Sequence, residues 1–385
     1  MSKKSTALVT AMMLTSLILA FVAGYLSHAI ITPQRQGFPV LAQAFGILED
    51  HAFGTLPEAR VLEYGMIRGM IEAFGDPYTA FIEPAAHELR TDSLEGRFGG
   101  IGVRIDRGQD GEVLLYPFPD SPAALAGLVQ GDRLLSVDSL VVDIGTSLET
   151  VQAALRGPVP SKVSLGIGRG AANIRMEFEI ARAEIALPSV TWRIAPGEPT
   201  VGIVEINLIA ESTPAEVEAA IGALQAEGAA VFVLDLRDNG GGLQTAALET
   251  AGLFLEGGVL IIQQYRDQTP EELVVESPGP LTEIPLVVLI NGNTASAAEM
   301  IAGALQAHGR ATIVGTPSYG KDAIQLVFEL QDGSSIQVTA ARWWIPGIEF
   351  PSESGGLVPD IVVSPSEQGF DPYLQTAIRA LMDNK

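Results

Sequence analysis

Ser296 is the first residue whose type and place suggest chemistry, because it lies where a predicted strand passes into a predicted helix. The strand covers 286–290, a polar turn follows, and an amphipathic helix is predicted over 296–308. Free N–H groups and the helix dipole at such a start favour developing negative charge, as a nucleophilic hydroxyl requires. Ser296 with Glu299 also matches a capping box, which needs no catalytic role. The segment leaves both roles open, and they can overlap.

Lys321 is the second candidate, in a glycine-rich stretch that begins at Gly315. The stretch nearly fits the phosphate-binding pattern G-x-x-x-x-G-K-[ST], so nucleotide binding is a rival hypothesis. Asp322 replaces the magnesium-binding hydroxyl, and 325–330 continues as a strand where a phosphate loop must open a helix. Gly320 and the apolar residues after Asp322 instead favour a partly buried lysine stem.

A third signal is the strand end that carries Asp235 and Arg237 into three glycines at 240–242. Open backbone amides there could bind an oxyanion, and a tight turn is the structural alternative. We expect Asp235 and Arg237 to order this loop rather than to react.

The elements around these residues alternate between strand and helix, which predicts an α/β domain. Strands are expected at 201–206, 230–236, 259–263 and 286–290, helices at 214–227, 243–255 and 296–308, a hairpin at 326–330 and 336–339, and a closing helix at 372–382. Helical periodicity also covers 40–48 and 59–74 and predicts a small helical segment over about 40–90. Its His51 and His87 are interpreted as surface residues rather than metal ligands.

Residues 98–169 carry short strands and two short helices, which describe a partly open barrel. The stretch resembles a PDZ domain through Phe98-Gly99-Gly100-Ile101-Gly102, Ser121-Pro122-Ala123 and Gly131-Asp132-Arg133-Leu134. The resemblance implies that the amides of Gly100, Ile101 and Gly102 bind the C-terminal carboxylate of a protein.

Taken together, the order of these motifs over about 40–363 resembles the C-terminal processing peptidases, also called tail-specific proteases. The resemblance implies a catalytic unit of Ser296, Lys321 and Gln325, with oxyanion amides from Ala297 and Gly241. It includes Asp76-Pro77-Tyr78, Asp235-Leu236-Arg237 and Gly356-Leu357-Val358-Pro359-Asp360. The sequence departs from the family pattern at Gly240, Ala298, Asp322 and 347–349, which leaves the shape of the substrate site open.

A lysine base fits the residues available, because His308 is about 18 Å along the helix from Ser296 and is interpreted as a helix C-terminal residue. The lysine must be neutral to accept a proton, and burial in an apolar pocket can lower its pKa from about 10.4 to about 7. Uncharged Gln325 could orient Lys321 without restoring its charge. The two would be about 13 Å apart in a fully extended chain, so a bend between them is expected.

Composition restricts partners and compartment. The net charge of −23 argues against nucleic-acid binding, and the absence of cysteine excludes disulfides and thiolate catalysis. No metal or cofactor is predicted. Lysines at 3 and 4 before an apolar run over 7–26 favour an uncleaved single-pass anchor with the remainder extracytoplasmic, and a cleaved signal peptide with secretion is the alternative.

We therefore expect a multidomain α+β serine endopeptidase: a membrane anchor, a helical segment, a PDZ-like partly open β-barrel and an α/β protease core. Its substrates would be exported proteins with exposed C-termini, captured or gated by the PDZ domain, and a homo-oligomer is compatible with the sequence. The alternative is a membrane-tethered PDZ scaffold without catalytic activity. The predicted boundaries are 1–30 for the anchor, 31–39 for a linker, 40–95 for the helical segment, 96–172 for the PDZ domain, 173–364 for the protease and 365–385 for the C-terminal helix.

Overall fold

The computed structural model describes residues 38–170, 172–348, 356–364 and 371–383. The anchor predicted over 1–30, and nearly all of the linker predicted over 31–39, lie outside these residues. Among the helices that are described, none combines the length and apolar character needed to cross a membrane.

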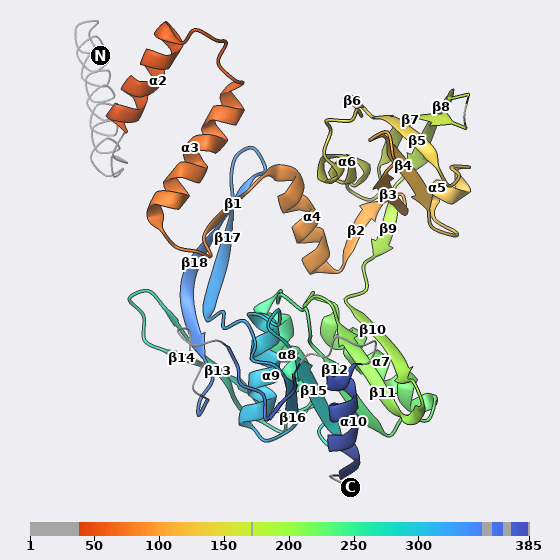
Figure 1. Cartoon of the computed structure of the whole chain (residues 1–385), viewed down its shortest axis with the longest axis vertical. Coiled ribbons are helices and arrows are strands. Elements are labelled where there is room, and N and C mark those ends of the chain that lie inside the picture. Colours follow the sequence, from red (N-terminus) through yellow and green to blue (C-terminus); the bar gives the residue numbers. More distant parts are fainter. Residues whose placement is uncertain (1–37, 171, 349–355, 365–370, 384–385) are drawn as a thin grey trace, which may run out of the picture. The chain divides into compact units, whose positions relative to one another are not determined.

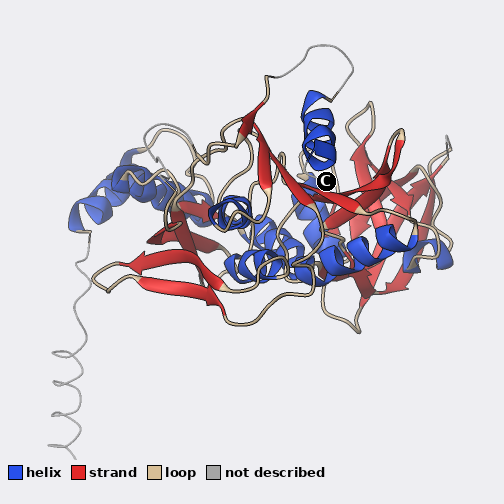
Figure 2. Cartoon of the chain, turned by 90° about the horizontal axis from the view of Figure 1, so that it is seen from below, coloured by secondary structure: helices blue, strands red, loops and turns tan. Residues whose placement is uncertain are grey.

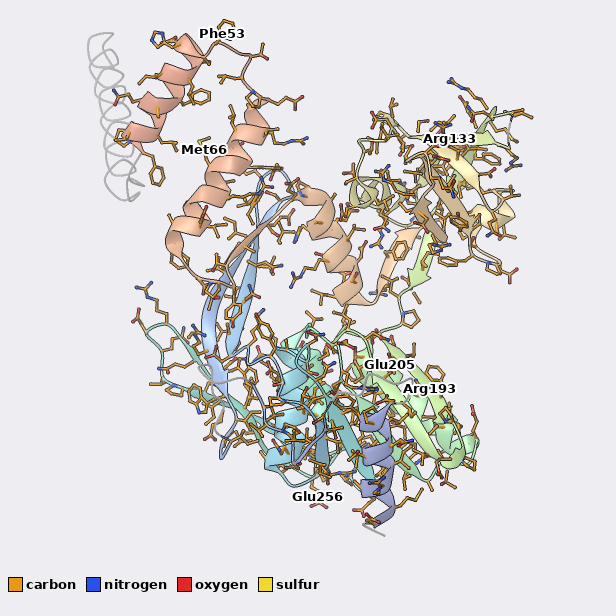
Figure 3. All side chains as sticks on the ribbon, viewed as in Figure 1. Phe53, Met66, Arg133, Arg193, Glu205 and Glu256 are labelled. Carbon is orange, nitrogen blue, oxygen red and sulfur yellow. The ribbon has the colours of Figure 1, made fainter. Side chains whose placement is uncertain are left out.

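Two helices, α2 (Pro39–His51) and α3 (Ala59–Phe74), form the first described part of the chain. The bounds of α3 are those that its apolar periodicity predicts. No residue of α2 is buried, and Phe53 in the following connection and Met66 on α3 expose their side chains (Figure 3). Helix α3 buries Tyr64, which α2 does not match with any residue of its own.

After α3 the chain forms a short strand, a further helix and one side of a two-stranded ribbon (Figure 1). The helix α4 and the strand β1 lie inside the segment predicted over 40–95, and neither was predicted separately. Gly96 ends α4 in the left-handed conformation with φ 73°, as a helix C-terminal glycine does. The elements are β1 (Ala80–Ile82), α4 (Pro84–Glu95), and β2 (Arg97–Gly100) paired antiparallel with β9 (Ala183–Ala186).

The PDZ-like segment is a six-stranded sheet in the order β3-β4-β5-β7-β8, with β6 beside β5. Its core is an apolar cluster in which Leu115, Val151 and Leu165 are fully buried. Strand β8 extends the sheet beyond the boundary predicted at 172; it alternates apolar and polar residues but exposes most of both. The elements are β3 (Val103–Arg107), β4 (Val113–Pro117), α5 (Pro122–Leu125), β5 (Asp132–Val137), β6 (Leu140–Val141), α6 (Leu148–Leu155), β7 (Lys162–Arg169) and β8 (Ile174–Ala181).

The α/β core is built on a six-stranded sheet in the order β10-β11-β12-β15-β16-β19, parallel except for the β10–β11 pair. Adjacent residues of β12 face opposite layers: Phe232 packs with α7, α8 and α9, and Val233 packs with α10. Figure 2 shows the strands in red and the helices in blue. Burial on both faces explains the continuous apolar strands. At the outer strand, Arg193 pairs with Glu205 at 3.3 Å (Figure 3). The elements are β10 (Val190–Ala195), β11 (Glu198–Ile206), α7 (Thr213–Ala226), β12 (Val231–Asp235), α8 (Gln244–Gly252), β15 (Leu286–Ile290), α9 (Ala297–Ala307), β16 (Thr312–Gly315), β19 (Ile361–Val362) and α10 (Pro372–Asp383).

A second sheet joins segments that are far apart in sequence, in the order β1-β18-β13-β14 with β17 paired to β18. Strand β1 pairs with the start of β18, so the chain just after α3 is hydrogen-bonded to the hairpin that follows Lys321. The remaining elements are β13 (Gly258–Tyr265), β14 (Glu271–Val275), β17 (Ala323–Glu329) and β18 (Ser335–Trp344).

The rival nucleotide-binding hypothesis is wrong, because no helix follows the glycine-lysine loop. Gly315 ends β16, the loop passes Lys321, and Ala323 begins β17. A phosphate loop needs a helix N-terminus at this point to hold the phosphate groups.

Candidate active site

Ser296 lies in a sharp turn between the buried strand β15 and helix α9. Its backbone has φ 54° and ψ −118°, a region that residues other than glycine rarely adopt, so the turn holds local strain. Two bonds to the β12 end fix the turn: Thr294 Oγ1 donates to the carbonyl of Leu236 at 2.8 Å, and the Ala295 N–H donates to that of Asn239 at 2.9 Å. Ser296 is thus held by the protease core itself.

The glycine loop packs directly against Ser296. A Cβ atom on Gly241 would lie 3.0 Å from Ser296 Cβ and 3.1 Å from Ala297 N, and Gly241 has φ +101°, so only glycine suits the position. The Gly241 N–H donates to Asn239 Oδ1 at 2.8 Å. The Ala297 N–H has no acceptor among the described residues. Of the two predicted oxyanion donors, Ala297 is therefore free and Gly241 is occupied.

Glu299 connects the serine segment to the lysine loop. Its Oε2 accepts the Ser296 N–H at 2.7 Å and the Lys321 N–H at 3.0 Å, and its Oε1 accepts the Gly320 N–H at 2.7 Å and the Ser318 hydroxyl. The Ser296 bond is one half of the predicted capping box, and no sequence pattern indicated the other three bonds. Burial raises the pKa of Glu299, and the four donors oppose that rise.

Lys321 and Gln325 meet through the expected bend. The register of β17 shifts between Ile324 and Gln325, and Lys321 Nζ donates to Gln325 Oε1 at 2.6 Å. The Gln325 amide in turn donates from Nε2 to the carbonyl of Tyr78, which leaves its oxygen facing the lysine. The Lys321 amine is thus held on an uncharged acceptor.

Tyr78 was not predicted to take part in the site. Lys321 Nζ lies 5.2 Å from the centre of the Tyr78 ring. The turn that carries Tyr78 is held by Asp76, which accepts from the N–H of Thr79 at 2.7 Å and from the Thr339 hydroxyl at 2.7 Å. The sequence offered the Asp76-Pro77-Tyr78 motif as a signal, but not its position next to Lys321.

The surroundings of Lys321 favour its neutral form. Burial lowers the pKa of the Lys321 ammonium, and the positive charge of Arg90 lowers it further, against the carboxylates of Glu299 and Asp76, which raise it. A lysine of lowered pKa can accept a proton at a lower pH than a solvated lysine.

Ser296, Lys321 and Gln325 all line one cavity of about 220 Å³. Within the described part of the chain, no hydrogen bond joins the Ser296 hydroxyl to Lys321 Nζ. The cavity therefore contains the predicted nucleophile and the predicted base without a direct contact between them, an arrangement often found when no substrate is bound.

Other predicted roles near the site are structural. Arg237 donates to both oxygens of Asp235, from Nε at 2.9 Å and from NH2 at 2.6 Å, and NH1 donates to Asp371 at 3.0 Å. This network fixes the end of β12 to the start of α10. His308 is the C-terminal cap of α9, and its Nε2 lies 2.9 Å from the carbonyl of Val259. His87 is half-buried and bonds through Nδ1 to Ser335, and the described residues contain no group of side chains that could hold a metal ion.

The predicted tail-binding loop of the PDZ-like segment ends β2. Ile101 is buried in the core of the sheet, so this residue offers only its backbone to a ligand. Gly102 has φ +69°, and a Cβ atom there would lie 2.5 Å from Ser121 Cβ. The loop thus depends on glycine for its shape, as a backbone nest for a carboxylate does.

A serine at a strained strand-to-helix turn, beside a free backbone amide and a lysine held on an uncharged acceptor, is an arrangement typical of serine-type hydrolases. Comparison with known proteins agrees with this class. The model of peptidase family S41 matches residues 200–363, and the PDZ domain model matches residues 116–169.

Two curated relatives extend the match over most of the chain. A carboxyl-terminal-processing protease from Picosynechococcus is 35% identical over 312 residues, which are 80% of this chain and 74% of the relative. A carboxy-terminal-processing protease from Bartonella bacilliformis is 30% identical over 362 residues, 90% of this chain and 82% of the relative. The chain therefore belongs to the carboxyl-terminal-processing proteases of peptidase family S41, and it is a serine peptidase with a PDZ domain. Among solved structures, a photosystem II D1 C-terminal processing protease aligns at 30% identity over 88% of this chain and 90% of its own, with a TM-score of 0.46.

Proposed function

We propose that the chain cleaves exported proteins near their C-termini, with Ser296 as nucleophile, Lys321 as general base and Gln325 as the residue that orients the base. The observation that carries this assignment is the Lys321 amine held on an uncharged acceptor in the cavity that Ser296 also lines. The single-pass anchor over 1–30 and the extracytoplasmic location belong to the same proposal, and they rest on the apolar run of the sequence.

In the first step, neutral Lys321 takes the proton of the Ser296 hydroxyl while Ser296 Oγ attacks the scissile carbonyl. The resulting ammonium gives that proton to the departing amine, which leaves an ester on Ser296. Water then attacks the ester, Lys321 again takes a proton, and Ser296 recovers its hydroxyl. Since no hydrogen bond yet joins the two side chains, substrate binding must bring Lys321 Nζ to the hydroxyl.

The developing oxyanion would receive the free Ala297 N–H at the start of α9, where the helix dipole adds to the hydrogen bond. Gly241 would join after its N–H leaves Asn239 Oδ1. The contact of Gly241 with Ser296 Cβ supports this role, because it places the glycine loop beside the nucleophile.

The decisive experiment compares Ser296→Ala and Lys321→Ala with the parent protein on an unstructured protein substrate. Each variant should lose at least about 10⁴-fold in kcat/KM, because the nucleophile and its base act as one unit. Both should keep the parent far-UV circular dichroism spectrum and a cooperative thermal transition. Full turnover by either variant would refute the assignment, and an inert parent protein would favour the scaffold alternative.

We further propose that the PDZ domain gates the site through α4. Asp92 on α4 forms a 2.6 Å ion pair with Arg156 at the end of α6, and both side chains are largely buried. The Arg156 guanidinium also stacks on Phe98 at 4.0 Å, next to the tail-binding loop. Because Ser296 and Lys321 are not in contact in this arrangement, the ion pair is assigned to a resting state.

Breaking that pair should raise basal cleavage. Arg156→Gln is expected to increase kcat/KM on an unstructured substrate by up to about tenfold, since charge-assisted bonds contribute about 1.5–3 kcal/mol and part of this is lost to solvent. Arg175→Gln, an exposed position on β8, is the control. A fall in activity in Arg156→Gln alone would mean that the pair supports the active state instead.

A further inference from the structure

The catalytic cavity has an uneven charge. Its basic lining residues are Arg90, which is always charged, and Lys321, whose surroundings favour the neutral form. No carboxylate lines the cavity within the described part of the chain. The other lining side chains are apolar or uncharged, among them Leu94, Met300 and Gln337. This is unexpected in a protein with 46 acidic and 23 basic residues. The cavity is therefore suited to a negatively charged group of a ligand.

Arg90 has no partner that explains its position. It lies on α4, and in the described structure its guanidinium has no hydrogen bond, ion pair or ring contact. Two residues further along the same helix, Asp92 pairs with Arg156, so α4 turns one charge toward the PDZ segment and another toward the cavity. The Arg90 guanidinium stays charged at physiological pH.

Arg90 is an exposed residue that lines the cavity, so a bound anion can reach its guanidinium. A guanidinium presents five donors in a planar fork that matches the two oxygens of a carboxylate. We propose that Arg90 binds a carboxylate of the substrate inside the catalytic cavity and so selects acidic groups next to the scissile bond. This inference rests on the proposed function, and it adds a specificity residue to it.

Two carboxylates could meet Arg90: the terminal α-carboxylate of a substrate cut close to its end, or an acidic side chain near the cut. The experiment separates them with four peptides of one sequence. Two differ in a C-terminal acid or amide, and two differ in Glu or Gln at the position after the cleaved bond. Arg90→Gln is compared with the parent and with Arg97→Gln, which removes an exposed charge paired with Glu184 outside the cavity.

One of the two peptide pairs should show a preference for its charged member. In the parent and in Arg97→Gln, kcat/KM for that charged peptide should exceed kcat/KM for its neutral partner by about 10- to 100-fold, as expected for hydrogen bonds to a charged group. In Arg90→Gln that ratio should fall to about 1. Loss of the acid-over-amide ratio identifies the terminal carboxylate, and loss of the Glu-over-Gln ratio identifies a side chain. Ratios that persist in Arg90→Gln overturn the inference, and their loss in Gly102→Ala instead would assign the carboxylate to the PDZ loop.

The ratio of kcat/KM for the charged and neutral peptides also distinguishes carboxylate binding by Arg90 from a purely electrostatic effect of Arg90 on Lys321. Without Arg90 the pKa of Lys321 should rise, which lowers turnover of all four peptides at neutral pH but leaves their ratios unchanged. An unchanged ratio with such a shift would therefore count against carboxylate binding. The same peptides bound to Ser296→Ala, with and without Arg90→Gln, give the answer by fluorescence anisotropy without any cleavage. An inert parent would refute the proposed function, whereas equal binding of acid and neutral peptides would refute this inference.

Discussion

The two halves of the site are held in different ways. Ser296 lies at the junction of one strand and one helix, both in the core of the α/β domain, and its turn is bonded to the neighbouring strand end. Lys321 lies in a loop, and its amine is positioned by Gln325 on a hairpin and by Tyr78 on the turn before β1. The proposed nucleophile is thus fixed locally, whereas the position of the proposed base depends on contacts between distant segments. We expect mutations around the lysine to affect activity with little loss of stability.

Glu299 is the direct test of this comparison, because it bonds to both halves. Glu299→Gln keeps the size of the side chain but replaces an oxygen acceptor by a donor that faces backbone N–H groups. We expect kcat/KM to fall by about 10²-fold, as for a misplaced reacting group. The free energy of unfolding should fall by about 1–3 kcal/mol, the cost of unsatisfied buried groups.

Glu218→Gln, an exposed position on α7, is the control for Glu299→Gln and should change neither quantity. Peptide kinetics and urea unfolding measure the two effects. Parent-like activity in a destabilised Glu299→Gln protein would show that the two halves are positioned independently.

Gln325→Glu tests the lysine half alone. A carboxylate next to Lys321 Nζ would form an ion pair and raise the lysine pKa by about 1–3 units. Since the proposed mechanism requires the neutral amine, the rise of kcat/KM with pH should move to higher pH by the same amount. At pH 7 activity should fall by about 10- to 10³-fold and recover in part as the pH increases.

Gln264→Glu makes the same change at an exposed position of β13 and should leave the pH profile in place. A Gln325→Glu profile that overlays the parent profile would mean that Lys321 is not the group whose protonation limits the reaction.

The difference between the two halves also explains what the sequence could predict. The periodicity of 286–308 placed Ser296 at a helix start, and the glycines at 240–242 predicted a tight loop. Both features follow from local geometry. The four bonds of Glu299, the position of Tyr78 and the presence of Arg90 in the cavity could not be predicted, because each joins segments whose pairing depends on the folded sheet. For Glu299 the capping pattern indicated one bond of four.

The same distinction holds for the fold. Strand β15 and helix α3 have the predicted bounds, since each carries a clear apolar pattern. Strands β16 and β14 were missed, because they are short and offer little alternation. The bend between Lys321 and Gln325 was expected from distance alone, but its form as a register shift in β17 required the partner strand β18.

Tyr78 gives the smallest and sharpest test of the lysine half. Its ring covers Lys321 Nζ at 5.2 Å, and two effects oppose each other: the ring excludes water, which lowers the lysine pKa, and its face attracts the ammonium, which raises it. Because burial is the largest cause of the lowered pKa of Lys321, water exclusion should prevail. Tyr78→Ala should therefore move the pH profile to higher pH and reduce kcat/KM at pH 7 by about 3- to 10-fold.

Tyr78→Phe keeps the ring and the carbonyl that binds Gln325, so its profile should match the parent. A shift of Tyr78→Ala to lower pH would show that attraction to the ring outweighs exclusion of water, and that the lysine half is tuned by its aromatic neighbour rather than by burial.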